Sequence, residues 1–156
     1  MTTTITSAPL ELPELENADE LSRADLVFYG VDHSGPSYEA RVFLNNPQAD
    51  AETERVLDRG YAGSFTVFGH NGCFGDAGHC LPDERHRDEF DLRAPHPLRP
   101  LTMTVIATEA IRRALVEPAV REVTVTVVAV VPDDGFPKAG GDPLAFEYVR
   151  MLTYES

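Results

Sequence analysis

The sequence predicts a mainly β protein, built as an antiparallel β-sandwich of six or seven strands with one or two short helices. Short segments rich in β-branched and aromatic residues recur along the chain, and Gly, Pro or Asn residues separate them. The clearest segment, residues 122–131, alternates Val with Thr and ends in an apolar run, which is typical of a central strand. Helix signals are confined to residues 48–60 and 109–116. With 156 residues and 42% hydrophobic content, one such domain can bury a core of its own.

Residues 1–23 are expected to form a flexible acidic tail. They are rich first in Thr and then in Glu and Asp, and Pro9 and Pro13 interrupt them. No internal repeat and no dividing linker follows. We therefore expect a single β-sandwich domain over residues 24–156, with a long Cys/His loop over residues 70–100.

The first two strands of the domain are predicted to form a hairpin. Residues 26–29 are an apolar and aromatic run, and residues 38–44 alternate with Tyr38 on one face. Between them, residues 33–36 read His-Ser-Gly-Pro, which is a turn signal. A connection of this length is common between antiparallel neighbours.

The next segment is expected to be a short polar helix followed by a strand. Residues 48–60 are mostly polar, and Gly60 is a residue type that commonly ends a helix. Residues 61–70 then alternate, with Phe65 and Val67 on one face. This period of two predicts a strand that is buried on one side.

The second half of the domain is predicted to hold three strands and one helix. Residues 101–106 have the strand pattern, and Thr108 is a suitable N-cap for a helix over residues 109–116. The strand at 122–131 follows, and residues 144–154 form the last strand of the sandwich.

The charge of the chain excludes several classes of partner. There are 26 acidic and 13 basic residues, which gives a formal net charge of −13. Such a chain repels phosphate backbones and anionic lipid, so we expect no nucleic acid and no membrane as partner. No apolar run approaches the roughly 18 to 20 residues that a membrane span needs. The first 20 residues lack the basic and apolar regions of a secretory signal, and we expect a cytoplasmic protein.

The loop over residues 70–100 carries the residues with the most chemistry. His70, Cys73, His79 and Cys80 lie within eleven positions, with three Gly residues among them. Thiolates and imidazoles are the ligands that Cu(I) and Zn(II) prefer, so these four residues are the candidate ligands for copper or zinc. Two other interpretations stay open, a local Cys73–Cys80 disulfide and two thiols without a function.

Other catalytic motifs are absent from the sequence. It holds no phosphate-binding glycine loop, no dinucleotide fingerprint, no HExxH and no GxSxG. Asp32, His33 and Ser34 are adjacent, but neighbours on an extended chain point apart and do not form a catalytic triad. We therefore expect no catalytic residue in this chain on its own.

Four segments resemble the C-terminal β-sandwich domain of the type 3 copper proteins, the group of tyrosinase, polyphenol oxidase and molluscan hemocyanin. Residues 40–45 are similar to an early strand of that domain, and residues 61–70 resemble its Gly-Ser-Phe strand that ends in Gly-His. Residues 101–115 resemble its strand and short helix, and residues 122–131 its next long strand. The resemblance spans about residues 25–155.

The resemblance implies a role without catalysis. In that family the dicopper site needs six histidines, whereas this chain has five. There the sandwich covers the entrance to the copper site, a side chain can plug it, and in some members a Cys-containing segment helps to deliver copper. Phe74, between Gly72 and Gly75, is then the candidate plug, although it could equally anchor the loop on the sandwich. This chain would be an accessory domain or subunit that binds a tyrosinase-like oxidase or another protein, and that binds or delivers copper.

Two alternatives belong to other classes of protein. A small mononuclear metalloenzyme would use the same loop with an open coordination position. A structural interaction domain would instead close the loop with the Cys73–Cys80 disulfide.

Overall fold

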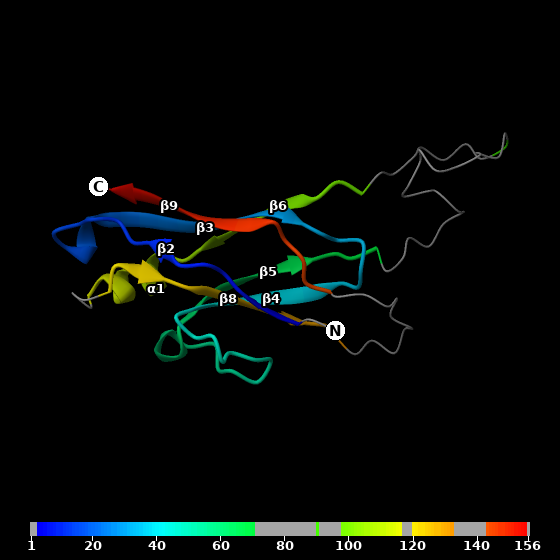
Figure 1. Ribbon diagram of the computed structural model, residues 1–156, viewed down its shortest axis with the longest axis horizontal. Coiled ribbons are helices and arrows are strands. Elements are labelled where there is room, and N and C mark those ends of the chain that lie inside the picture. The colour runs from blue at the N-terminus through cyan, green and yellow to red at the C-terminus, as the bar shows by residue number, and fades with distance from the viewer. Residues whose placement is uncertain (1–2, 71–89, 91–97, 117–119, 133–142, 156) are drawn as a thin grey trace.

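Two antiparallel sheets lie face to face and form the body of the protein (Figure 1). The computed structural model describes residues 3–70, 90, 98–116, 120–132 and 143–155. One sheet has the strand order β1-β8-β4-β5, the other has the order β6-β3-β9, and β2 and β7 form a small third sheet. The mainly β sandwich predicted from the sequence is therefore confirmed. The strands are β1 (Thr4–Thr6), β2 (Leu10–Glu11), β3 (Leu21–Val31), β4 (Tyr38–Leu44), β5 (Tyr61–Val67), β6 (Leu101–Ile106), β7 (Glu122–Val123), β8 (Val125–Val130) and β9 (Tyr148–Glu155), and the helices are η1 (Ala18–Glu20), η2 (Leu57–Arg59) and α1 (Thr108–Leu115).

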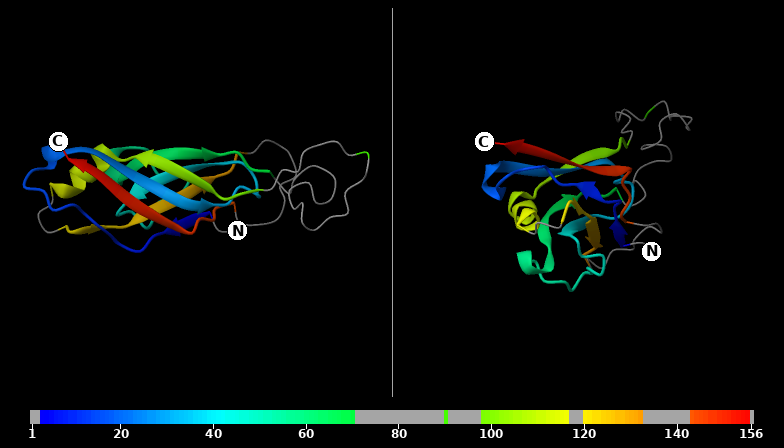
Figure 2. Two further views of the ribbon diagram at one scale, coloured as in Figure 1. Left: turned by 90° about the horizontal axis from the view of Figure 1, so that it is seen from above. Right: turned by 60° about the vertical axis from the view of Figure 1, so that its left-hand side comes forward.

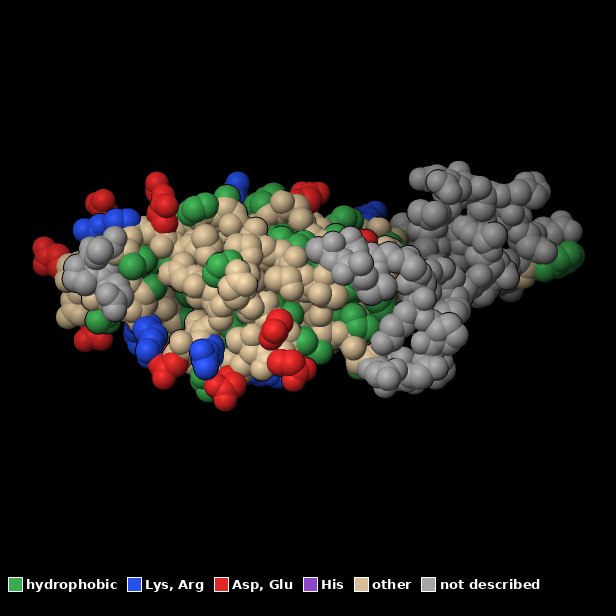
Figure 3. Space-filling view, turned by 60° about the horizontal axis from the view of Figure 1, so that its bottom comes forward, with side chains coloured by type: hydrophobic (Ala, Val, Ile, Leu, Met, Phe, Trp, Pro, Cys, Tyr) green, Lys and Arg blue, Asp and Glu red, His purple; other side chains and the backbone are tan. Residues whose placement is uncertain are grey.

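The two sheets present different outer faces. Seen from above, the three-stranded sheet is the front layer, and no described segment covers its outer face (Figure 2). On the four-stranded sheet, Glu39 forms ion pairs with Arg41 and Arg55 at 3.1 and 2.8 Å. Figure 3 shows that side of the molecule, where acidic and basic side chains lie close together.

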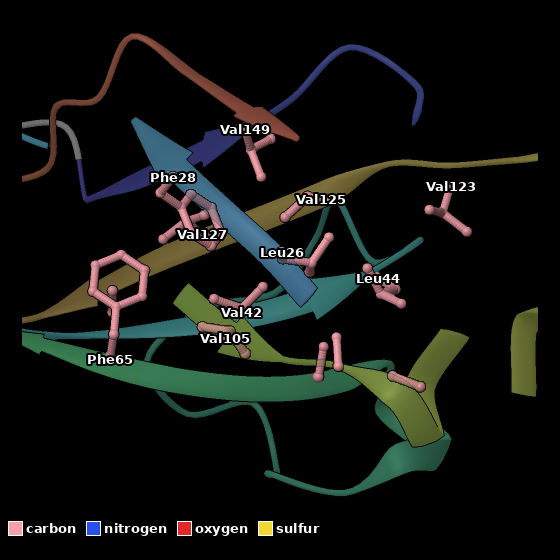
Figure 4. Close-up of a cluster of buried hydrophobic side chains, with 14 of the residues drawn as sticks. Leu26, Phe28, Val42, Leu44, Phe65, Val105, Val123, Val125, Val127 and Val149 are labelled. Atoms are coloured by element: carbon pink, nitrogen blue, oxygen red, sulfur yellow. The ribbon is translucent and has the colours of Figure 1, made fainter. Parts of the chain in front are cut away.

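The core is the layer of apolar side chains between the sheets (Figure 4). Phe28 of β3 lies near its centre, with its ring centroid 5.1 Å from that of Phe65 and 5.4 Å from that of Phe146. Alternate residues of each strand point into this layer, as the period of two predicts. Fully buried or nearly buried members are Leu26, Phe28, Val42, Phe65, Val105, Val125, Val127 and Val149.

The strand predicted at residues 122–131 is central, as expected, but it is interrupted. β8 pairs with β1 on one side and with β4 on the other, while β7 pairs with β2. At the break, the side chain of Asn45 accepts a hydrogen bond from the Thr124 N–H at 2.9 Å, and the Asn45 N–H donates to the Thr124 carbonyl at 2.9 Å. Asn45 holds a positive φ of 51°, a conformation that Asn tolerates better than most residues.

The hairpin predicted for the first two strands is wrong. β3 pairs with β6 and β9, whereas β4 lies in the other sheet between β8 and β5. Residues 32–37 therefore cross from one sheet to the other, a distance of about 10 Å that six residues span easily. Local turn chemistry identified the bend at residues 33–36 but carried no information on which strand follows in the same sheet.

Part of the segment predicted as a tail is paired with the sandwich. β1 pairs with β8 through Thr4, Ile5 and Thr6, and β2 pairs with β7. Leu12 is buried at the edge of the core. The β-branched Thr-Ile-Thr run can extend a sheet even though the composition around it is typical of a mobile segment.

The helices differ in detail from the prediction. Residues 48–60 hold only the short η2, which ends at Gly60 with a φ of 81°. The N-cap of α1 is Ala107 and not Thr108, whose hydroxyl instead accepts a hydrogen bond from the Ala24 N–H at 3.1 Å. Arg112 of α1 donates two hydrogen bonds to the Leu21 carbonyl, which attach the helix to the start of β3. None of the described helices is long and apolar enough to cross a membrane.

The first residue of β4, Tyr38, buries a polar atom in the core. Its side chain is almost fully buried, and its hydroxyl has no hydrogen-bond partner among the residues that the structure describes. Burial raises the pKa of Tyr38 to about 12, and the negative charge of Asp32 adds to this shift. Loss of water from an unpaired hydroxyl costs free energy of folding, so Tyr38 is less favourable here than an apolar ring of the same shape.

Replacing Phe28 with Ala is expected to lower the free energy of unfolding by about 3–5 kcal/mol, because the substitution opens a cavity between Phe65 and Phe146. Urea denaturation followed by circular dichroism measures this loss. The control Tyr154→Ala removes a ring that is half exposed on β9, and it should cost less than about 1 kcal/mol. Equal losses for the two variants would contradict the central position of Phe28.

Replacing Tyr38 with Phe is expected to raise the free energy of unfolding by about 1 kcal/mol at neutral pH, because the unpaired hydroxyl is removed. The folded-state pKa of Tyr38 of about 12 lies above its ordinary value of 10.0, so the unfolded chain releases this proton first as the pH rises. The wild type should therefore lose stability between pH 10.0 and about 12, and the variant should lose less. Denaturation curves across that range test both statements, and a variant less stable than the wild type at neutral pH would refute them.

Candidate functional site

The end of β5 leads directly to His70, the one predicted metal ligand that the structure describes. The His70 N–H donates a hydrogen bond of 2.9 Å to the His33 carbonyl. The two imidazole rings pack edge to face, with centroids 4.9 Å apart and an interplanar angle of 83°. The Nδ1 atom of His70 is buried. His70 is therefore held in a fixed position before the loop begins.

His33 is a part of this site that the sequence did not identify. Its Nε2 atom lies 2.9 Å from the Arg99 carbonyl oxygen. Because a carbonyl oxygen only accepts, Nε2 of His33 donates this hydrogen bond. His33 thus connects the segment after β3 to His70 and to the residues just before β6. The sequence around His33 indicates only a turn. It could not show that His33 packs against His70, because the two histidines are 37 positions apart.

The turn after β3 is fixed by its own side chains. The Asp32 carboxylate accepts hydrogen bonds from the Ser34 N–H and the Ser34 hydroxyl, both at 2.9 Å. The Ser34 hydroxyl therefore bonds to Asp32 directly, and the His33 ring faces His70 instead.

A close backbone approach clamps the end of β5 against the same turn. The Gly69 N–H donates a hydrogen bond of 2.9 Å to the Ser37 hydroxyl. A Cβ atom at Gly69 would collide with the backbone of Gly35 and Pro36, so only Gly fits at this position. The backbone that precedes residue 71 is consequently held in place at the end of β5.

Phe68 gives this end of the sandwich an exposed apolar ring. Its side chain is 79% exposed, and its ring centroid lies 6.3 Å from that of His70. Single exposed apolar residues are common on protein surfaces. Next to the His33–His70 pair, however, Phe68 gives this end of the sandwich an exposed apolar side chain.

The remaining predicted site residues lie outside the described residues. These are the candidate ligands Cys73, His79 and Cys80, together with the candidate plug Phe74. The Cys73–Cys80 disulfide considered as an alternative falls in the same segment. Within the part of the chain that the structure describes, no group of three or more His, Cys, Asp or Glu side chains converges. The metal site therefore stays a prediction, to which the described residues contribute His70.

A hollow away from this site lies between the 44–46 turn, η2 and α1. Its volume is about 360 Å³, and Arg59 and Arg113 are among its lining residues. Both cations have an acidic partner, since Arg113 pairs with Asp58 at 2.6 Å and Arg59 lies 3.8 Å from Glu54. This hollow consequently offers no uncompensated charge for an anionic ligand.

Comparison with known proteins identifies the fold. No protein-family model matches the sequence, and no curated protein sequence matches it either. Several solved structures do match. Recombinantly expressed latent aurone synthase (polyphenol oxidase) matches 99% of this chain with a TM-score of 0.53 at 15% identity, over 24% of its own chain. The same enzyme from natural source matches 98% of this chain with a TM-score of 0.54 at 16% identity, over 25% of its own chain.

A third structure agrees with these two. The recombinant enzyme co-crystallized with hexatungstotellurate(VI) matches 98% of this chain with a TM-score of 0.54 at 14% identity, over 24% of its own chain. This chain therefore spans about a quarter of the length of the structures that it matches. The resemblance seen in the sequence is confirmed at the level of the fold: almost the whole chain is folded like one quarter of a latent polyphenol oxidase, a tyrosinase-like type 3 copper protein.

Proposed function

We propose that this chain is a non-catalytic accessory domain of a tyrosinase-like copper oxidase, either as a part of the same polypeptide or as a separate subunit. The supporting observation is the match of nearly the whole chain to one quarter of latent polyphenol oxidases. These matched enzymes are latent, that is, held inactive. We infer that the role of this domain is to cover the substrate entrance of an oxidase until the enzyme is needed.

The histidine content supports a role without catalysis. The dicopper site of this family needs six histidines, and the whole chain has five. His33 and His70 already pack on one another at the end of the sandwich, and not as a spaced pair on a helix. On this basis the oxidation of phenols belongs to the partner domain, and this chain controls access to it.

Phe74 is the side chain proposed to close the entrance. Phe74 follows His70 by four positions. Hydrogen bonds to His33 and Ser37 fix the backbone of His70 and Gly69 at the end of the sandwich. A short distance from a rigid base limits the freedom of an apolar side chain and so reduces the entropy lost when it inserts into a partner. Phe68 shows that this end of the domain already exposes one aromatic ring.

Cys73, Cys80, His70 and His79 are proposed to hold copper as cargo for the same oxidase. Two thiolates and one or two imidazoles are a soft donor set that suits Cu(I), with Zn(II) as the alternative. The described part of the site fits this use, because the His70 imidazole is held against His33 at the end of β5. Copper released from such a site would fill the metal centre of the partner.

The covering role predicts inhibition of an oxidase by this chain. The test uses a tyrosinase-like oxidase domain in its active form and measures phenol oxidation with increasing amounts of the chain. Wild type is expected to suppress the rate. Phe74→Ala is expected to weaken this suppression by roughly tenfold, because the inserting ring is lost. The control Phe68→Ala removes another exposed ring and should keep most of the effect. No suppression and no binding by the wild type would refute the covering role.

The copper role predicts one Cu(I) ion per chain. Fully reduced protein is titrated with Cu(I) under anaerobic conditions against a colorimetric Cu(I) chelator. Replacing Cys73 and Cys80 with Ser should abolish binding, because the soft ligands are lost, whereas His96→Ala should leave it unchanged. Absence of Cu(I) binding by the wild type would refute this role. A thiol count of zero before reduction would instead favour the disulfide interpretation.

A further inference from the structure

The outer face of the three-stranded sheet carries a row of exposed aromatic and aliphatic side chains. On β3, β6 and β9 the residues that alternate with the core residues point outward, and no described segment lies over them (Figure 2). Four of these apolar residues are between 41 and 61% exposed. We call the following set the aromatic face: Tyr29, Ile106, Tyr148, Arg150, Leu152 and Tyr154.

The side chains of the aromatic face are already ordered. The Tyr29 and Tyr148 rings stack with centroids 4.8 Å apart and an interplanar angle of 22°. The Arg150 guanidinium carbon lies 5.2 Å from the centroid of the Tyr148 ring. Because these contacts fix the rotamers in the free protein, a partner that binds here pays little side-chain entropy. Tyr and Arg are also the residue types most enriched in the energetic centres of protein interfaces.

The charge of the aromatic face is opposite to that of the chain. Among the outward residues of the three strands, the one acid is Asp25, which is buried and accepts a hydrogen bond of 2.8 Å from Arg23. Arg150 then leaves the face with a positive charge, although the whole chain carries a net charge of −13. Two exposed acidic residues, Glu109 and Glu147, lie at the borders of the face. The fitting partner surface has an apolar centre, a carboxylate opposite Arg150 and basic residues around it.

The size of the face argues against a second copy of this chain as the occupant. Three strands at about 4.8 Å spacing and about 7 residues long give a footprint on the order of 350 Å². A stable interface needs roughly 800 Å² per partner, and two copies would also repel each other through their net charge. The apolar surface continues past Ile106 into a groove that Leu57 and Tyr61 also line. A partner that reaches this groove from the face would supply the missing area.

We propose that the aromatic face is the surface on which the catalytic domain of a tyrosinase-like oxidase docks. The inference rests on the proposed function, because the oxidase is the partner named there. In the matched latent enzymes about three quarters of the chain lies outside the part with this fold, so a large partner surface accompanies the fold in those proteins. The aromatic face and its groove provide apolar area for such a partner, and Arg150 provides a positive charge opposite one of its carboxylates.

The experiment uses isothermal titration calorimetry to measure binding of this chain to the tyrosinase-like oxidase domain of the inhibition test. Leu152→Asp places a negative charge in the middle of the face and should weaken binding at least roughly tenfold. Arg150→Glu reverses the one unpaired charge of the face without removing buried surface, and it should weaken binding to a similar extent. The control Ser64→Asp makes the same charge change as Leu152→Asp on the opposite sheet, beside Arg41, and should bind within about twofold of the wild type. Circular dichroism and thermal unfolding establish that all four proteins are folded.

Each result decides between the two proposals. Loss of binding in both face variants with retention in Ser64→Asp supports the docking surface. Equal binding by all four proteins overturns the docking surface and leaves the covering role in place. No binding by the wild type overturns both. A wild type that instead forms dimers in sedimentation velocity, with Leu152→Asp monomeric, assigns the face to a second copy and overturns the inference.

Discussion

Pairing of β3 along both edges, together with burial of its inner face in the core, is the constraint on which the rest of the structure depends. β3 pairs with β6 and β9 along its two edges. Leu26 and Phe28 fill the core on one side, while Asp25 and Val27 are buried on the other side beneath longer outward side chains. With both edges paired and its inner face in the core, the strand has one position available to it. That position determines where Tyr29 points and where the turn after Val31 begins.

Strand positions could be predicted from the sequence, because alternation reports directly which residues are buried. β4 and β6 begin and end where their patterns do, at Tyr38–Leu44 and Leu101–Ile106. Partners could not be predicted, because pairing is decided by contacts between distant segments. The hairpin expected between β3 and β4 failed for this reason, and so did the N-cap role of Thr108, whose hydroxyl bonds to Ala24, 84 positions away.

The candidate sites also contain some residues that the sequence identifies and others that only the fold brings together. His70 was identified because imidazoles and thiols are close together in the sequence, whereas His33 was not, since the fold alone brings it to His70. The aromatic face was also missed, although its signal is present in the last strand. Tyr148, Leu152 and Tyr154 alternate with Val149 and Met151, so β9 has apolar residues on both sides. A strand of a two-layer sandwich buries only one side in the core, and a second apolar side therefore indicates a further contact.

The two proposed contacts support one another through β3. Tyr29 belongs to the aromatic face, and His33, four positions later, clamps the base from which Phe74 extends. Insertion of one ring into an oxidase gives too little binding energy to hold a domain in place. Docking of the aromatic face would keep that ring at a high effective concentration near the entrance, so a weak plug could close the site. Release of the face would then open the entrance without any change in the plug itself. The sheet face, rather than the loop, would set when the oxidase is covered.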